Sequence, residues 1–365
     1  MESSMMESSM MESSMMESSM MDLSYIDMRY YSMVIKQLRD FFESKGWYEV
    51  YTQGRLSILA ASKEPNAIFT YNYEGEVWPL PQSGQLWLEK ELLLNPDVPG
   101  VFCLSTSYRN KSDLVEGRED KMFPVFEYEM HGDVNDVINL EEELLEYLGF
   151  GEKELYRHKE YTELTEAYGV KKLDYKHTED LCTEDTPVVF LKNYPTKIVP
   201  YWNVKHNGET ANKVGVILHG IETITSAERS INKDEIRKQF YTIEDGRYAT
   251  QLFSNFTKAR VVKELDQFLE HDMIVRSGGS IGVTRMIRAM KMSNILYKIH
   301  AIPEPKIDIL TKEEELLQHI SKSTKSRCWG IPVAARNRTA SMGSLLVTAA
   351  SVGGEKIIDL AISSI

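Results

Sequence analysis

Cysteine is scarce in this chain of 365 residues, which contains only Cys103, Cys182 and Cys328. The three lie far apart in the sequence, so they match neither a disulfide framework nor the close spacing of a zinc site. We therefore expect a protein of a reducing compartment, the cytoplasm. Long apolar runs are missing as well, because no stretch approaches the roughly 18 consecutive apolar residues of a membrane-spanning helix.

An excess of positive charge is also absent. The chain has 42 Lys and Arg against 55 Asp and Glu, which gives a formal net charge of −13. Polyanions attract proteins mainly through Lys and Arg, so this composition argues against broad nonspecific binding to nucleic acid. A local basic patch could still hold one end of a nucleic acid.

The two ends of the chain differ in character from its middle. Residues 1–20 are four copies of Met-Glu-Ser-Ser-Met, a low-complexity repeat that we expect to be disordered or a frayed helix. Residues 21–300 have the length and apolar content of one large globular domain. Residues 301–365 are first polar and basic and then small and apolar, and we assign this tail no role.

Apolar periodicity predicts an α+β domain, with a mostly antiparallel sheet and helices around it. Strict alternation of strands and helices, as in a parallel dinucleotide-binding fold, is not found. The pattern predicts helices over 27–46, 138–148, 233–240, 250–271 and 285–292, a hairpin over 67–80, and strands over 47–51, 100–108, 123–131, 186–191, 197–202 and 214–218.

One segment with chemical potential runs from Gly220 to Arg229. It holds Glu222 and Arg229 seven residues apart, with Ser226 between them. In an extended strand an odd separation places side chains on opposite faces. A shared pocket therefore requires a bulge or a turn, and the run before Ser226 could hold one.

A second segment, 278–285, is rich in glycine and leads to Arg285 at the start of a predicted helix. Glycines let the backbone approach a ligand closely, and arginine binds phosphate. Upstream of both lie Ser-Gly-Gln-Leu-Trp-Leu-Glu at 83–89, Ser-Tyr-Arg-Asn at 107–110, Gly-Arg at 117–118 and Met-Phe-Pro-Val-Phe-Glu-Tyr-Glu at 122–129.

In this order, the segments resemble the motifs of class II aminoacyl-tRNA synthetases of the aspartate/asparagine branch. Residues 25–50 resemble motif 1, residues 102–129 motif 2 and residues 278–285 motif 3, and 83–89 is similar to a run found in asparaginyl enzymes. The resemblance covers roughly residues 22–299. It implies the class II catalytic fold, a homodimer formed through the motif 1 helix, and the substrates ATP and an amino acid.

The resemblance also implies roles for residues around the nucleotide. Alone, each has an ordinary alternative: a surface or solvated arginine, a core phenylalanine, a glycine turn. The implied assignments are Arg109 on the ATP α-phosphate and the substrate carboxylate, Arg118 and Arg285 on the terminal phosphates, Phe123 on adenine, Gly279 and Gly282 beneath the nucleotide, and Glu222 on Mg²⁺.

A further set of residues is expected around the amino acid. Arg229 resembles the residue that meets the substrate side chain, and Glu64, Ser83 and Gln85 resemble those near the α-amino group. Ser226, Glu228 and Arg229 together resemble the archaeal, tRNA-independent asparagine synthetase related to asparaginyl-tRNA synthetase. The adjacent Glu228 and Arg229 could equally form a surface ion pair, which contributes little.

Several departures from the family count against a standard synthetase. Gly215 stands where a second acidic metal ligand is expected, seven positions before Glu222. Lys111 replaces a glutamate, and Glu119 replaces a histidine and so brings negative charge near the expected γ-phosphate unless a metal or Lys121 offsets it. The anticodon-binding barrel of this branch is not found before the motif 1 helix.

These observations lead to one hypothesis and two rivals. The first hypothesis is activation of aspartate by ATP, followed by attack of ammonia to give asparagine. One rival is a ligase that charges tRNA with asparagine or aspartate. The other is a nonenzymatic paralogue that regulates a partner, which the substitutions at Gly215, Lys111 and Glu119 favour.

Overall fold

The computed structural model describes residues 26–61, 64–111, 114, 119–183, 186–199 and 201–296, together with three backbone strands nearer the C-terminus. The chain divides into two compact units, Met1–Ile302 and Pro303–Ile365. The repeat at 1–20, expected to be disordered or a frayed helix, and most of the tail at 301–365 lie outside the described residues.

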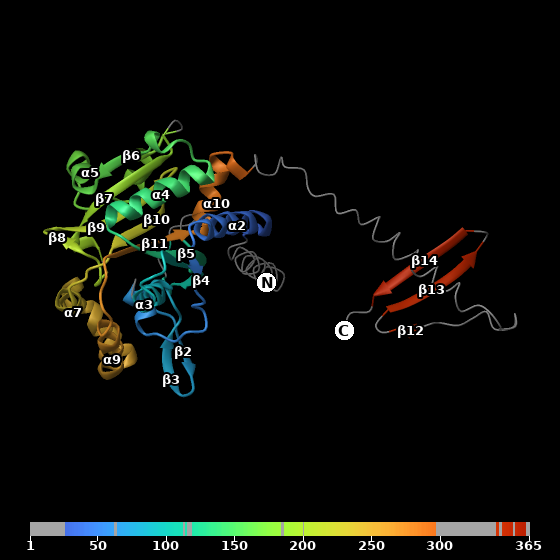
Figure 1. The fold of residues 1–365 in the computed structure, drawn as a ribbon, viewed down its shortest axis with the longest axis horizontal. Coiled ribbons are helices and arrows are strands. Elements are labelled where there is room, and N and C mark those ends of the chain that lie inside the picture. The colour runs from blue at the N-terminus through green and yellow to red at the C-terminus, as the bar shows by residue number, and fades with distance from the viewer. Residues whose placement is uncertain are drawn as a thin grey trace, which may run out of the picture. The chain divides into compact units, whose positions relative to one another are not determined.

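A nine-stranded sheet forms the frame of the first unit (Figure 1). Its pairing is antiparallel except where β1 meets β4 and β6 meets β7. The predicted α+β class with a mostly antiparallel sheet is therefore confirmed. The strand order is β1 (Tyr48–Glu49), β4 (Gly100–Tyr108), β5 (Met122–His131), β11 (Arg276–Gly282), β10 (Ile221–Glu228), β9 (Thr210–Leu218), β7 (Val188–Pro195) and β6 (Arg157–Glu160), with β8 (His206–Asn207) on β9.

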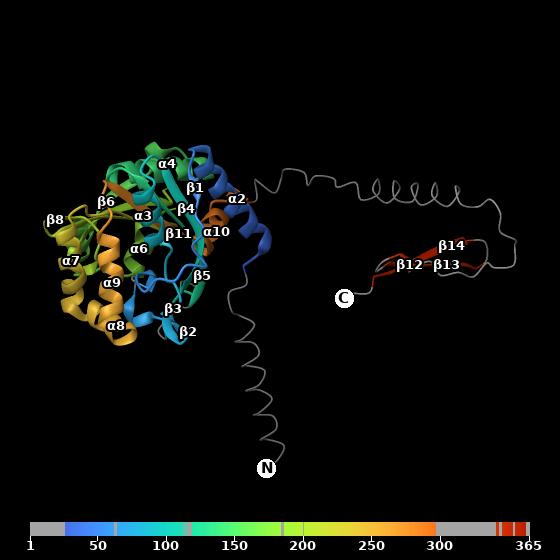
Figure 2. The same cartoon turned by 60° about the horizontal axis from the view of Figure 1, so that its bottom comes forward.

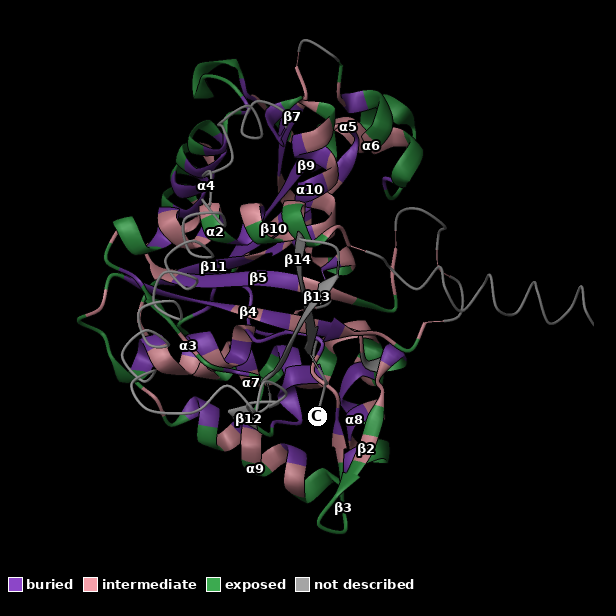
Figure 3. Ribbon diagram, turned by 90° about the vertical axis from the view of Figure 1, so that its right-hand side faces the viewer, coloured by how far each residue is buried: buried purple, intermediate pink, exposed green. Residues whose placement is uncertain are grey.

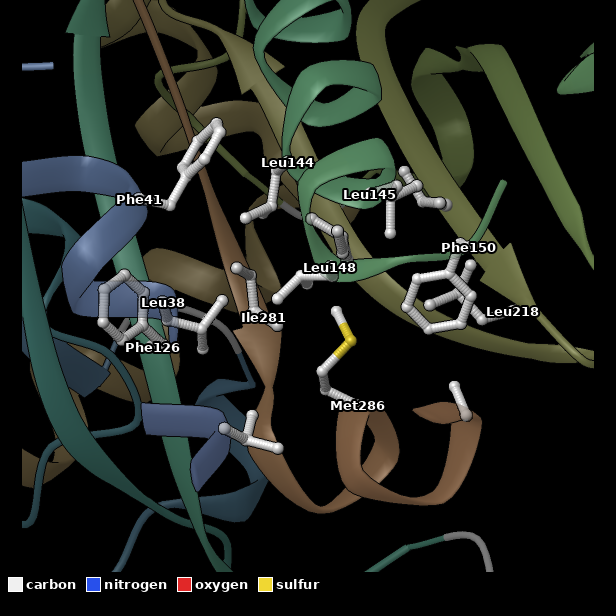
Figure 4. Close-up of a cluster of buried hydrophobic side chains, with 14 of the residues drawn as sticks. Leu38, Phe41, Phe126, Leu144, Leu145, Leu148, Phe150, Leu218, Ile281 and Met286 are labelled. Carbon is white, nitrogen blue, oxygen red and sulfur yellow. The ribbon is translucent and has the colours of Figure 1, made fainter. Parts of the chain in front are cut away.

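One face of the sheet carries the main hydrophobic core. Three helices pack there: α2 (Met28–Ser44), α4 (Val134–Leu148) and α10 (Val283–Met292). Figure 4 shows their side chains meeting those of the sheet, with Leu38 of α2, Leu144 of α4 and Met286 of α10 around Phe126 and Ile281. Figure 3 shows β5 and β11 as largely buried strands in the centre of this arrangement.

The opposite face of the sheet carries α3 (Gln85–Leu94), which contacts β4, β5 and β11. A second apolar cluster joins α3 to α7 (Lys233–Thr242), α8 (Arg247–Phe256) and α9 (Lys258–Leu269), which Figure 2 shows on one side of the unit. Side chains of β5 alternate between the faces, as a strand requires: Phe126 and Tyr128 enter the main core, while Glu127 and Glu129 turn toward α3.

Most predicted elements are present, with shifted ends. Helix 27–46 is α2, capped by Asp27, whose carboxylate accepts from the backbone N–H of Arg29 at 2.9 Å. The hairpin at 67–80 is β2 (Thr70–Tyr73) and β3 (Glu76–Pro79). The single helix predicted over 250–271 is wrong, because Thr257, with φ +64°, separates α8 from α9.

The strand predicted over 197–202 is also wrong, since Thr196–Ile198 is a 3-10 turn. The elements without a sequence prediction include β6, α5 (Tyr161–Tyr168) and α6 (Tyr175–Leu181). The second unit contains an antiparallel sheet of β12 (Ser341–Met342), β13 (Leu345–Val352) and β14 (Glu355–Ile362). Among the described residues no helix is both long and apolar enough to cross a bilayer.

Candidate active site

A bulge in β10 brings Glu222 and Arg229 to the same face of the sheet. Glu222 pairs with Ile217 and Ile224 with Val216, so β10 advances two residues where β9 advances one. The extra residue resets the alternation of side chains. The expectation that a shared pocket requires a bulge in the run before Ser226 is therefore confirmed.

Two adjoining cavities open on this face. The first, here called the Arg229 cavity, is lined by Ser83, Gln85, Glu89, Lys213, Ser226, Arg229 and Gly279 among others. The second, the Arg109 cavity, is lined by Arg109, Lys111, Glu119, Phe123, Glu222, Gly282 and Arg285 among others. Tyr201, Thr225 and Ser280 belong to both linings, so the cavities are two halves of one cleft.

Arg229 lies in a buried network of two arginines and two carboxylates. Its guanidinium donates to Glu129 from Nε at 3.2 Å and from Nη2 at 3.1 Å, and its Nε lies 3.7 Å from Glu89 Oε1. Arg276 donates from Nη2 to Glu89 at 2.8 Å. All four side chains are at most 7% exposed, so the network is buried. With every group ionised, its two positive and two negative charges cancel.

Burial and mutual charge shift the pKa values of the groups in this network. Burial raises the pKa of Glu129 to about 7, although the charge of Arg229 opposes this. Burial alone would lower the pKa of Arg229, but the carboxylates of Glu129 and Glu89 outweigh it and raise that pKa. The cation that the sequence predicted for the substrate side chain is present, but protein carboxylates already neutralise it.

Ser83 and Gln85 line the same cavity, and protein groups occupy their polar atoms. The Ser83 hydroxyl donates to the carboxylate of Glu127, and Gln85 Nε2 donates to the Tyr128 carbonyl at 3.0 Å and to Glu129. Gly278 allows this packing, because a Cβ there would lie 1.8 Å from Glu129 Oε2. Gly278 and Gly279 thus let side chains of β5 lie close to β11.

The Arg109 cavity brings together five of the residues predicted around the nucleotide: Arg109, Phe123, Glu222, Gly282 and Arg285. The Arg109 guanidinium lies 4.9 Å from the centre of the Phe123 ring, and its Nη1 is 3.4 Å from Glu64 Oε1. Arg285 donates from Nη1 to the backbone carbonyl of Glu222 at 2.8 Å. Glu64 lines neither cavity but is held beside Arg109, and Arg118 lies outside the described residues.

Two of the departures from the family compensate each other. Lys111 and Glu119 form an ion pair with Nζ 3.2 Å from Oε2, inside the Arg109 cavity. Lys111 therefore offsets the negative charge of Glu119 near the expected γ-phosphate, a compensation that the sequence did not predict. The exchange of both residue types leaves the local charge balanced.

Glu222 is engaged by a lysine at the junction of the cavities. Lys213 Nζ lies 3.1 Å from Glu222 Oε1, which also accepts from Thr225 Oγ1 at 3.0 Å and from the Tyr194 hydroxyl at 3.4 Å. Burial would raise the pKa of Glu222, but Lys213 and the Thr225 hydroxyl outweigh it, so this pKa falls below its usual value. Lys213 lines the Arg229 cavity and Glu222 the Arg109 cavity.

The surroundings of Glu222 do not fit the Mg²⁺ that the sequence predicted there. The described residues contain no group of three or more His, Cys, Asp or Glu side chains placed to hold a metal ion. A Cβ at Gly215 would lie 2.2 Å from the Tyr194 hydroxyl and 2.5 Å from Glu222 Oε1, so a second carboxylate has no room there as the site stands. Mg²⁺ in nucleotide sites is bound by one or two carboxylates together with phosphate oxygens and water, but here an ammonium group already contacts the one carboxylate.

Glu228 is directed away from both cavities, contrary to expectation. Its carboxylate accepts from Lys205 Nζ at 2.7 Å, from Asn212 Nδ2 at 2.7 Å and from the backbone N–H of Val134 at 3.4 Å. Strand alternation places it on the face opposite Arg229. The expectation that it meets the substrate is wrong, and so is the alternative of a surface pair with Arg229, since Glu228 is buried.

Three residues of the cleft and its buried network have no role predicted from the sequence: Lys213, Glu89 and Glu129. A signal for Lys213 is present, because this lysine directly precedes the apolar run 214–218. Glu127 and Glu129 alternate with apolar residues in the strand predicted over 123–131, and this pattern indicates one apolar and one polar face. Glu89 ends the Ser-Gly-Gln run and was noted only as part of the motif.

Comparison with known proteins places the chain among relatives of this architecture. The family of class II tRNA synthetases (D, K and N) matches residues 11–306. The aspartate–tRNA(Asp) ligase of Pyrobaculum aerophilum is 23% identical over 234 residues, which are 57% of this chain and 53% of that protein. The aspartate–tRNA(Asp/Asn) ligase of Aeropyrum pernix is 24% identical over 306 residues, 72% of this chain and 64% of that protein.

Solved structures share the fold. Asparaginyl-tRNA synthetase of Pyrococcus horikoshii, complexed with asparaginyl-adenylate, superposes with a TM-score of 0.58 at 20% identity, over 72% of this chain and 64% of that one. The enzyme of Entamoeba histolytica, also in complex with asparaginyl-adenylate, gives 0.55 at 16% identity, over 72% and 63%. The chain thus spans about half to two-thirds of the length of these relatives.

Proposed function

Because this chain belongs to the class II tRNA synthetase family of the D, K and N group, we propose that it activates aspartate or asparagine with ATP to the aminoacyl-adenylate. The observation that carries the proposal is the cleft with two halves that meet at Lys213 and Glu222. Relatives named as aspartate ligases, and neighbours solved with asparaginyl-adenylate, support the choice of amino acid.

The Arg109 cavity suits ATP. Phe123 offers an aromatic face for the adenine, and Arg109 and Arg285 offer guanidinium groups for phosphate oxygens. In the reaction a substrate carboxylate oxygen attacks the α-phosphorus, and pyrophosphate leaves with the electrons of the broken P–O bond. Arg109 would stabilise the charge that develops on the α-phosphate, so catalysis rests on positioning and electrostatics. The family generally uses Mg²⁺ with ATP, but no step here depends on a metal at Glu222.

Three charged side chains line the Arg229 cavity: Arg229, Glu89 and Lys213, and Lys213 is paired with Glu222. The neighbouring Arg229 and Glu89 present one cation and one anion, and this limits which end of a ligand they accept. A side-chain amide matches both, with its oxygen toward Arg229 and its NH₂ toward Glu89. The α-ammonium and α-carboxylate of an amino acid match them equally well. A lone β-carboxylate matches poorly, because it would add a third negative charge to a network that two carboxylates already neutralise.

Two functions follow from these two matches. In the first, aspartate places its α-groups at Arg229 and its β-carboxylate at Arg109, ammonia attacks the β-acyl carbon, and AMP leaves as asparagine forms with loss of a proton from nitrogen. In the second, asparagine places its amide at Arg229 and its α-carboxylate at Arg109, and the adenylate passes to tRNA or another acceptor. In that orientation the half-exposed Glu64 carboxylate beside Arg109 suits the α-ammonium.

The acceptor and the orientation are tested together by pyrophosphate release from the full chain. Aspartate with ammonia should give asparagine in the first case, whereas asparagine alone should support release in the second, with transfer only when tRNA is added. If neither amino acid supports pyrophosphate release, the nonenzymatic paralogue remains.

We also propose that α2 forms a homodimer interface, and sedimentation analysis of the full chain tests this.

A further inference from the structure

We infer that Lys213 takes the place of the divalent cation at the junction of the two cavities, so that ATP binds here without a metal held by Glu222. The inference rests on the proposed function, since it assigns the charge that faces the reacting phosphate. It starts from three residues in contact: Lys213, Glu222 and Tyr194.

Lys213 is held firmly in this position. Its side chain is only 8% exposed, its ammonium lies 3.5 Å from the centre of the Tyr194 ring, and it pairs with Glu222 at 3.1 Å. An ammonium group has three N–H donors. With one donor used by Glu222 and one face over the aromatic ring, the group keeps donor capacity for an oxygen of a ligand in the cleft.

Gly215 makes the reach of Lys213 possible. In the β9–β10 register Lys213 stands opposite Ala227 and Gly215 opposite Thr225, so the two lie on the same face of β9. Because Gly215 has no side chain, the Tyr194 hydroxyl and the Glu222 carboxylate occupy the space where its Cβ would lie. The absence of a side chain at Gly215 and the contact between Lys213 and Glu222 are therefore structurally linked.

Replacing a divalent ion and a second carboxylate by Lys213 also preserves the local net charge. A divalent ion on two carboxylates has zero net charge, and so does one lysine on one carboxylate. The lysine delivers its charge at the boundary that both cavities share, where the substrate carboxylate and the α-phosphate would meet. Lys213 is thereby assigned to ATP binding and to the transition state, as a covalently attached cation.

Calorimetric titration of the full chain with ATP tests this, once with excess EDTA and once with excess Mg²⁺. We expect wild-type affinities that agree within about threefold. Lys213→Met keeps the length of the side chain and removes its charge, so it should weaken binding of metal-free ATP by about tenfold or more. Lys213→Arg should restore much of that loss.

The control variant is Lys205→Met. Lys205 pairs with buried Glu228 at 2.7 Å but lies outside both cavities, so its loss should leave ATP affinity unchanged under both conditions. If Lys213→Met does not fold, the wild-type comparison still decides. Wild-type binding at least about tenfold tighter with Mg²⁺ overturns the assignment of Lys213 and leaves the proposed function standing. Absence of ATP binding in both conditions overturns the proposed function, and the assignment with it.

Discussion

Replacement of Arg229 by leucine should damage both stability and ligand binding. Leucine removes the guanidinium that binds Glu129 in a bidentate manner. The cation that remains near Glu129 is Arg276, whose Nε lies 3.8 Å from Glu129 Oε1. Glu89 keeps Arg276 at 2.8 Å. Removal of one partner of a buried ion pair costs about 3–5 kcal/mol, a large share of the roughly 5–15 kcal/mol that stabilises a typical domain.

A second substitution separates the two effects. In Arg229→Leu/Glu129→Gln the buried carboxylate becomes an amide that still accepts a hydrogen bond from Gln85. We expect the double variant to recover about half or more of the lost stability, because the unpaired charge is gone. It should not recover amino-acid binding, because the cation that faces the ligand is still missing.

Urea unfolding measures the first effect, and calorimetry with aspartate and asparagine measures the second. The matched control is Arg39→Leu, which removes an equally bidentate pair with Glu49 at the surface, both side chains being 37% exposed. Its cost should not exceed about 1 kcal/mol. If Arg229→Leu unfolds like the wild type, the network is not a stabilising ion pair. If it binds both amino acids unchanged, the substrate cavity is misassigned.

Three further predictions concern the nucleotide, a buried acid and the extent of the domain. Saturating ATP should raise the Tm of the wild type, whereas Arg109→Ala should lose turnover but unfold like the wild type, since its partner Glu64 is partly exposed. Burial raises the pKa of Glu141 from 4.5 to about 7, so the folded state holds a proton that the unfolded state releases. The free energy of unfolding should then fall by up to about 3 kcal/mol as the pH rises across this window, and Glu141→Gln should flatten the curve. A chain of residues 21–300 should fold with ATP binding intact, and loss of binding on truncation would show that the omitted residues contribute to it.

The sequence was sufficient for the fold class and for the position of the cleft. The residue pattern identified β4 and β5, and the glycine-rich run identified the entry into α10, although β11 itself was not predicted. The bulge in β10 was accessible too, because Glu222 and Arg229 have an odd spacing that a regular strand cannot bring to one face. These features are local, so residues near in sequence determine them.

The sequence was insufficient to predict ion pairs whose two side chains come from different strands or from loops that the sheet brings together. Lys213 and Glu222 meet only because β9 and β10 are neighbours, and Lys111 and Glu119 meet only through the ends of the β4–β5 pair. The direction of Glu228 follows from the alternation of strand side chains, which leaves the neighbour of Arg229 on the other face, but its partners Lys205 and Asn212 do not. Pairwise contacts across a sheet require the register, which no single strand contains.

The most direct test of the two-part active site is amino-acid-dependent exchange of radiolabelled pyrophosphate into ATP by the full chain. We predict that aspartate or asparagine stimulates exchange, that lysine and apolar amino acids do not, and that Arg109→Ala abolishes it. Exchange that no amino acid stimulates, in a protein that is folded by circular dichroism, would contradict the claim that the two cavities form one adenylate-forming site.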